Sequence, residues 1–361
     1  MPRDASIDEF RGALLEQILT FLWRQWSTLG ILGESEAEDK WIIDPEPLLI
    51  FSLEMGRYEP RLFDEILAWL EVNGEWLDTS RLRRILLKQE PHVLRAVGAA
   101  LRYVQDRGHE RKWGKVSNLC HDLCQKEPKG GLLEPLFKEK SGKFFPRAEG
   151  EKIDPSFRAF DLNRPRIRIQ KAAKGVPINA SANLRFQMRA LFGIGAKSEA
   201  LLYLLTHNEG RPREIAESVG LYWLSVHQAL SDLSRSGLVL KKPYGKRVGY
   251  WLSQAKWWQF LASNDFKYAS GPEWLDWIAI YSAFLALWKT VDGIASGIES
   301  DYMKSSKLQD SLEVVAREFS RAGYYVGALP SMGLPFDLHQ QTAVKFLNTI
   351  FDLRLKSGEV S

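Results

Sequence analysis

Residues 197–253 read KSEALLYLLTHNEGRPREIAESVGLYWLSVHQALSDLSRSGLVLKKPYGKRVGYWLS. The leucines that follow Ser198 are spaced for a helix with one face in a core, and this helix is expected to end at Gly210. Pro212 suits the first turn of a second helix, and Gly220 suits the tight turn after it. The first half of the stretch therefore predicts two short helices.

A third helix is predicted over residues 222–236. Its apolar side chains are spaced at four and three residues and so share one face: Val226, Leu230 and Leu233. Gly237 is expected to end this helix, and residues 238–240 to begin a strand. A second strand follows the turn Pro243-Tyr244-Gly245, so the whole stretch predicts three helices and then a two-stranded ribbon.

Four cations surround the predicted turn of the ribbon: Lys241, Lys242, Lys246 and Arg247. A hairpin tip is polar in any case, so a solvated turn is the alternative interpretation. Four cations separated only by a Pro-Tyr-Gly turn are better explained as a clamp for phosphates. Such a clamp would supply salt-dependent affinity and no base specificity.

Together these features resemble bacterial winged helix-turn-helix repressors of the MarR-like and ArsR-like kind. The resemblance covers about 60 of the 361 residues and is carried by a small residue near the front of the second helix, the glycine turn and a helix that ends in Ser-Gly-Leu-Val. It implies that the third helix enters the major groove of DNA, while the ribbon reaches the backbone or the minor groove.

The resemblance also implies which residues contact DNA. On the third helix, the base-edge or phosphate candidates are Ser225, His227, Gln228, Ser231 and Arg235, of which Gln228, Ser231 and Arg235 lie opposite the apolar face. Gln can pair with adenine, and Arg with guanine or phosphate. Arg213 of the second helix, Tyr244 at the turn and the four cations of the ribbon complete this set.

The third helix departs from that family at its start, where Tyr222, Trp223 and Leu224 replace the usual small polar residues. The aromatic side chains would either stack on sugar or be buried against another domain, and burial is the favoured interpretation. This departure weakens the prediction of detailed base readout.

Positive charge is concentrated in the middle of the chain. Residues 156–253 hold 16 Lys and Arg against 6 Asp and Glu, a net charge of +10, whereas the whole chain has +4. This asymmetry favours a polyanionic partner. Upstream of the helices, Arg164, Arg166 and Arg168 form a short basic segment that suits a strand with one basic face, a solvated connector or a phosphate-contacting arm.

The chain is expected to be mainly α, with a helical N-terminal domain (1–126), a linker and basic arm (127–177), a winged helix-turn-helix domain (178–264) and a helical C-terminal region (265–361). A short helix is predicted at 132–138. The N-terminal domain could alternatively be a degenerate helix-turn-helix, although no basic wing follows it.

Two C-terminal helices, over residues 273–291 and 338–356, offer apolar surface that could join two subunits in a homodimer on a two-fold operator. The apolar run 274–288 is shorter than the ~20 residues of a membrane span, so no membrane partner is expected. Two cysteines and a charged N-terminus suit a reducing cytoplasm.

No catalytic, metal or cofactor site is predicted. Cys120, His121 and Cys124 lack the second ligand pair of a zinc knot and suit buried core thiols. Residues 193–200 lack the glycine and Gly-Lys spacing of a phosphate loop. The leading expectation is a regulator of transcription, a repressor that binds double-stranded DNA. The alternatives are a winged-helix module for a protein or RNA partner, antitoxin-like in one form, and a nucleotide-handling enzyme without a recognisable motif.

Overall fold

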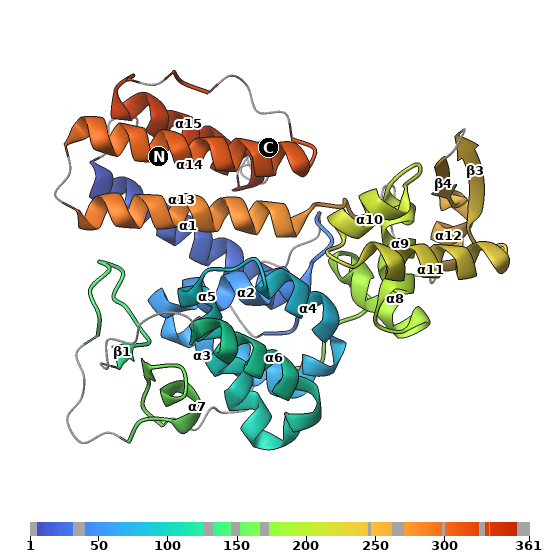
Figure 1. Ribbon diagram of the computed structural model, residues 1–361, viewed down its shortest axis with the longest axis horizontal. Coiled ribbons are helices and arrows are strands. Elements are labelled where there is room, and N and C mark those ends of the chain that lie inside the picture. The colour runs from blue at the N-terminus through green and yellow to red at the C-terminus, as the bar shows by residue number, and fades with distance from the viewer. Residues whose placement is uncertain are drawn as a thin grey trace, which may run out of the picture.

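The computed structural model describes residues 6–31, 40–125, 133–145, 152–166, 173–244, 247–261, 271–297, 300–324, 329–331 and 333–351. These residues form 15 α-helices, several 3-10 and π turns, and two small two-stranded sheets (Figure 1). The prediction of a mainly α protein is therefore confirmed.

The regular elements described in residues 6–125 are all helices: α1 (Ile7–Thr28), α2 (Pro45–Met55), η1 (Gly56–Tyr58), α3 (Pro60–Asn73), η2 (Gly74–Trp76), α4 (Thr79–Leu86), α5 (Pro91–Val104), η3 (Gln105–His109) and α6 (Glu110–Cys124). Pro91 occupies the first turn of α5. The N-cap of α4 is Asp78. Its carboxylate accepts hydrogen bonds from the backbone N–H groups of Ser80 and Arg81, which otherwise lack helical partners.

The prediction of a helix at 132–138 is wrong for the described residues of that segment. Instead β1 (Glu134–Pro135) pairs in parallel with β2 (Leu162–Asn163), and the short helix α7 (Pro155–Arg158) lies between them in sequence. Pro135 accounts for the difference, because a residue that precedes proline is driven out of the helical region into extended backbone.

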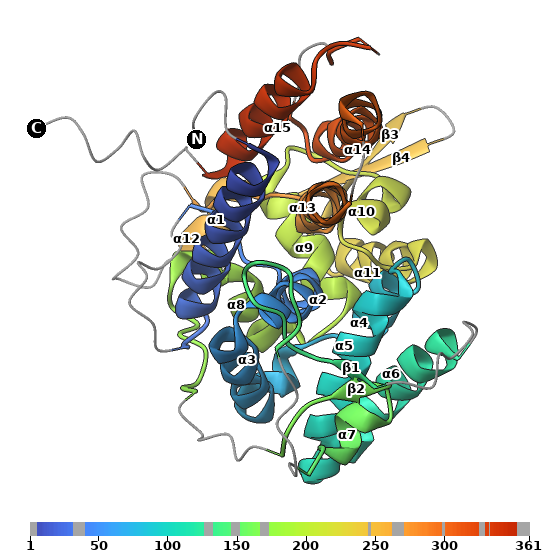
Figure 2. The same cartoon turned by 90° about the vertical axis from the view of Figure 1, so that its left-hand side faces the viewer.

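Of the C-terminal helices, α13 (Trp277–Ser296) packs on α1 and α2, α14 (Asp301–Arg321) packs on α13, and α15 (Phe336–Phe351) packs on α14. Residues from both ends of the described chain therefore share one hydrophobic core (Figures 1 and 2). Phe51 of α2 stacks on Tyr281 of α13 at a centroid distance of 4.9 Å. In its described part, the apolar surface expected to join two subunits is thus largely buried within one chain. By length and composition α13 could also cross a membrane, the one such helix in the described part, and half of that stretch is buried inside the protein.

The 3-10 turn η4 (Ser181–Asn183) contributes Ala182 to the first core. A second core belongs to the group of elements that follows, placed to the right in Figure 1: α8 (Leu184–Phe192), α9 (Ala196–Thr206), α10 (Pro212–Ser218), α11 (Trp223–Arg235), β3 (Leu240–Tyr244), β4 (Arg247–Trp251) and α12 (Gln254–Leu261). The helices and ribbon predicted from residues 197–253 appear in that order. Gly220 and Gly237 have φ angles of +68° and +78°, as expected of glycines that end helices or form turns.

Gly210 does not end α9, because His207 already caps that helix. Gly210 instead exchanges two backbone hydrogen bonds of 2.9 Å with Tyr250 of β4. A Cβ atom at position 210 would lie 2.8 Å from side-chain atoms of Ile215 and Tyr203, so the close approach requires glycine. The ribbon is thereby tied to the segment that leads into α10.

A buried cluster of six charged side chains joins the two cores: Asp44, Glu46, Arg81, Arg185, Arg189 and Glu199. Burial alone would raise the pKa of the Glu46 carboxyl, but Arg189 and Arg81 outweigh burial and hold this pKa well below its ordinary value. Because the cluster draws on α2, α4, α8 and α9, it fixes the second group of helices against the first.

Candidate nucleic-acid interface

Helix α11 buries one face and exposes the other along its length. Val226, Ala229, Leu230 and Leu233 are buried, as their spacing predicts. Among the candidate contacts, Ser225, His227, Gln228 and Arg235 are exposed, while Ser231 is half-buried. The structure therefore brings the five candidates of this helix onto one accessible side.

Asp232, which was not among the residues predicted to contact DNA, lies between these candidates on α11. Its carboxylate accepts a hydrogen bond of 3.1 Å from the Gln228 amide, and lies 3.8 Å from Arg235 and 3.5 Å from Lys197. The i to i+4 spacing from Gln228 to Asp232 is the signal that would have revealed this pair. Asp232 places a negative charge on the exposed face of α11, and its carboxylate takes up a hydrogen bond of the Gln228 amide.

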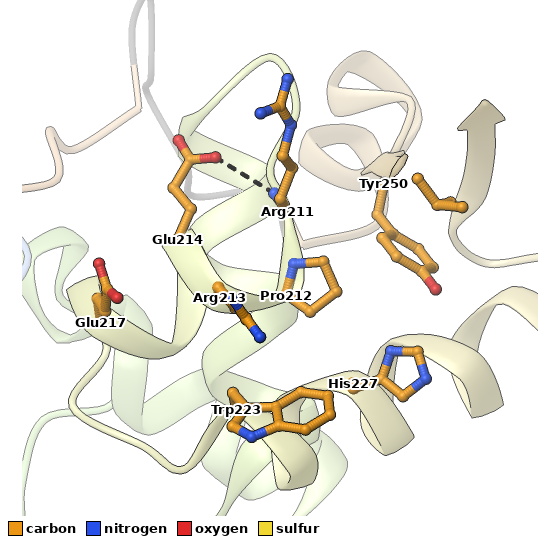
Figure 3. A pocket seen from close by; sticks show the side chains of 9 residues that line it. Arg211, Pro212, Arg213, Glu214, Glu217, Trp223, His227 and Tyr250 are labelled. Carbon is orange, nitrogen blue, oxygen red and sulfur yellow. Dashed lines mark hydrogen bonds between the residues drawn. The ribbon is translucent and has the colours of Figure 1, made fainter. Parts of the chain in front are cut away.

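A groove with a volume of about 640 Å³ separates α11 from the ribbon (Figure 3). Its walls come from the start of α10, from α11 and from β4: Arg211, Pro212, Arg213, Glu214, Glu217, Trp223, His227, Val248 and Tyr250. Arg213 reaches toward Trp223, whereas the guanidinium of Arg211 extends away from it (Figure 3). The groove combines a cation, an imidazole and an aromatic surface with two carboxylates.

Trp223 lies between a cation and an imidazole of this groove. Its ring lies 5.9 Å from the Arg213 guanidinium and 6.0 Å from the His227 ring. Tyr222, Trp223 and Leu224 are 57%, 50% and 62% exposed, so the favoured expectation that they are buried against another domain is wrong. The reason is the position of the first turn of α11. The buried face of this helix begins at Val226, and the turn before it extends beyond the edge of the core.

One of the two carboxylates of the groove, Glu214, completes the first turn of α10. It accepts hydrogen bonds from the backbone N–H of Arg211 at 3.3 Å and from the Tyr203 hydroxyl at 3.2 Å. A carboxylate at this place is stabilised by the free N–H groups at the start of the helix. Across the groove, burial raises the pKa of the Tyr250 hydroxyl above its ordinary value.

The two lysines of β3 lie on opposite faces of the ribbon. Lys241 pairs with Tyr250, and Lys242 pairs with Gly249. Because directly paired residues share a face, Lys241 lies on the same face as Tyr250, which lines the groove, and Lys242 lies on the other face. Lys246 lies outside the described residues, and for Tyr244 and Arg247 only the backbone is described.

The basic segment upstream needs correction at Arg164. This side chain is buried, pairs with Asp64 and lies over the Phe157 ring at 4.7 Å, so it cannot reach a phosphate. Burial lowers the pKa of its guanidinium, while the Asp64 charge opposes that effect. Arg166 is exposed, and Arg168 lies outside the described residues.

The net charge of the middle region overstates the charge at its surface. Arg164, Arg185 and Arg189 are buried with carboxylate partners, most of them from the N-terminal helices. Among the residues whose side chains are described, the accessible cations near the groove are Arg211, Arg213 and Lys241. The positive surface is therefore smaller and more local than the sequence indicates.

The described residues hold no group of three or more His, Cys, Asp and Glu side chains placed for a metal ion. Cys120 is a core residue, because its side chain is buried. Burial raises the pKa of its thiol to about 12. Comparison of the chain with family models, with curated proteins and with solved structures finds no match.

Proposed function

We propose that this chain is a DNA-binding regulator of transcription, a repressor, and that residues 184–261 form its winged helix-turn-helix. Support comes from the order α9, α10, α11, β3, β4 and from the pairing of Gly210 with Tyr250, which adds a third short segment to the ribbon. We interpret that order and pairing as a winged helix, in which the third helix would be the DNA-reading element.

The single observation that carries the proposal is the accessible face of α11 beside a groove with accessible cations. A 13-residue helix is about 20 Å long and about 10–12 Å across, and the DNA major groove is about 12 Å wide. Helix α11 can therefore enter the major groove along its exposed face. The ribbon then lies beside the DNA backbone.

The residues divide into two roles. Gln228 and Arg235 face base edges, where an amide selects adenine and a guanidinium selects guanine. Arg213 and Lys241 flank the groove and contact phosphates, which fixes register and supplies most of the affinity. The Asp232 carboxylate repels phosphates. Gln228 gives up its hydrogen bond to Asp232 only when a base edge offers a hydrogen bond in its place.

The test selects bound sequences from a random duplex pool and then measures affinity by fluorescence anisotropy over a series of salt concentrations. We expect log K to fall linearly with log salt, and the double variant Arg213→Ala/Lys241→Ala to reduce the slope by about 0.9 for each phosphate that it no longer neutralises. Arg158→Ala, on α7 at the far side of the molecule, is the matched control (Figure 1). A flat salt response, or equal binding by the double variant, would refute the proposal.

A second candidate function is a docking module for a protein partner, which the exposed Tyr222, Trp223 and Leu224 favour. Aromatic residues are enriched at the cores of protein interfaces. Binding of a protein to this surface should be abolished by Trp223→Ala/Leu224→Ala and retained in Gln228→Ala/Arg235→Ala. That result, with no binding of duplex DNA by the wild type, would replace the first proposal by the second.

A further inference from the structure

Helix α4 of the N-terminal region lies against the turn that leads into α11 (Figure 2). The Arg81 side chain donates a hydrogen bond from Nε to the carbonyl oxygen of Val219. The next residue, Gly220, packs beside the Ile85 side chain, with a distance of 3.7 Å from a Cβ atom built at Gly220. The N-terminal helices therefore touch the helix-turn-helix at the turn itself.

Three arginines of α4 have different surroundings. Arg81 is buried, and Asp44 and Glu46 neutralise it. Arg84 is half-buried, and its guanidinium carbon lies 4.7 Å from the ring centre of Tyr222, the residue that precedes α11. Arg83 is exposed. Within the described part of the chain, neither Arg83 nor Arg84 has an ion pair.

The contact with Tyr222 leaves Arg84 able to bind an anion. A guanidinium that lies over an aromatic ring uses its face, whereas its five N–H groups point outward in the plane of the group. Planar forks of this kind match the oxygens of a phosphate. Tyr222 thus restricts the position of Arg84 without consuming its donors.

We propose that α4 is a second DNA-contacting element, in which Arg83 and Arg84 bind backbone phosphates next to the bases that α11 meets. This inference rests on the proposed function, because it assigns a further part of the same DNA interface. It gives the N-terminal helical region a direct role in DNA binding. It also explains why a large aromatic residue stands before α11, since Tyr222 positions Arg84.

The buried ion cluster makes this contact rigid. Arg81 belongs to the cluster and to α4, and Arg189 and Glu199 bring α8 and α9 into it. Helix α4 therefore keeps its position relative to α11 when DNA is absent. An interface fixed in this way loses little conformational freedom on binding.

The test measures binding of the full chain to two duplexes, one selected and one of scrambled sequence, over a series of salt concentrations. The variants are Arg83→Gln and Arg84→Gln, with Arg158→Gln as the matched control. Removal of one arginine–phosphate pair should lower the salt slope by about 0.9 and the affinity at 150 mM salt by about fivefold, equally on both duplexes. Arg158→Gln should bind as the wild type does.

Two further variants separate a direct role in binding from a structural one. Tyr222→Phe keeps the ring and should bind normally, whereas Tyr222→Leu should show part of the Arg84 effect. Arg83→Gln disturbs no internal ion pair, so its result stands even if Arg84→Gln lowers the melting temperature. Unchanged affinity and slope in Arg83→Gln and Arg84→Gln, with weaker binding by Arg213→Ala/Lys241→Ala, would overturn this inference alone. Absence of DNA binding by the wild type would overturn the proposed function and this inference together.

Discussion

Arg189 and Glu46, 143 positions apart in the sequence, form a two-point ion pair with N–O distances of 2.8 Å and 3.0 Å. Arg189 also donates a hydrogen bond to Glu199 at 2.7 Å, and all three side chains are buried. The pair therefore connects α2 to α8 and α9 through charge rather than through apolar contact alone. Its removal should affect both cores.

Arg189→Met should destabilise the protein by about 3–5 kcal/mol, because it leaves the Glu46 and Glu199 carboxylates with too little positive charge in a dry site. Urea unfolding followed by circular dichroism measures this change. Arg317→Met, at an exposed position of α14, is the control and should stay within about 0.5 kcal/mol of the wild type. A destabilisation below about 1 kcal/mol in Arg189→Met would show that the cluster does not hold the two cores together.

Stability should fall in acid. Arginine charges outweigh burial at Glu46 and Glu199, so both carboxyls have a pKa below the ordinary 4.5 in the folded state. A carboxyl whose pKa is lowered on folding stabilises the folded protein above about pH 4.5. This stabilisation is lost as the pH falls toward the pKa of the carboxyl in the folded state. Burial raises the pKa of Asp276, which acts in the opposite sense. Unfolding measured from pH 7 to pH 3 should show the decline, and Glu46→Gln should flatten it; an unchanged slope in Glu46→Gln would contradict this assignment.

Gly220→Ala should be more destabilising than Gly237→Ala. Both glycines have positive φ, which costs an alanine about 1–2 kcal/mol. A Cβ at Gly220 would also lie 2.6 Å from the Cδ1 atom of Ile278, whereas a Cβ at Gly237 meets nothing within 4 Å. Thermal unfolding of the two variants isolates the packing contribution. Equal melting temperatures would mean that Ile278 moves aside without cost.

Gln228→Ala and Arg213→Ala should weaken DNA binding in different ways. Loss of Gln228 should reduce discrimination at one base pair by about 1–3 kcal/mol and leave the salt slope unchanged. Loss of Arg213 should lower the salt slope and weaken binding to all duplex sequences alike. Anisotropy titrations on the selected duplex and its single-base variants distinguish these effects. If Gln228→Ala weakens every duplex equally, Gln228 contacts the backbone instead of a base.

Asp232→Asn should increase affinity for DNA, because it removes a negative charge from the exposed face of α11 and keeps a side chain of similar size. The increase should be largest at low salt, where charges are least screened. Titrations at two salt concentrations measure it. Weaker binding by Asp232→Asn would show that Asp232 serves DNA binding by orienting Gln228 or Arg235.

Local patterns in the sequence predicted much of this structure. The apolar spacing of α11, Pro212 at the start of α10 and the positive φ at Gly220 and Gly237 depend on neighbours within one or two turns. Such features are encoded in a few consecutive residues. For that reason the order of elements in residues 197–253 was correct.

Other features were mispredicted because they depend on distant contacts. Arg164 is buried because Asp64 lies against it, 100 positions earlier, and Gly210 is required by the approach of Tyr250. Likewise, the number of cations gave no sign that Arg185 and Arg189 meet carboxylates from α2 and from the segment before it. Charge composition therefore located the basic region but not which of its charges reach solvent.

Under the proposed function, the ion cluster has a consequence for the speed of recognition. Because buried ion pairs tie α4 and α2 to α8 and α9, we expect no rearrangement of α4 relative to α11 after a first encounter with DNA. Encounters would then become productive as soon as the two surfaces are correctly oriented, at a rate governed by diffusion and by the attraction between accessible arginines and phosphates. The buried charges would thus favour fast association without ever touching the DNA.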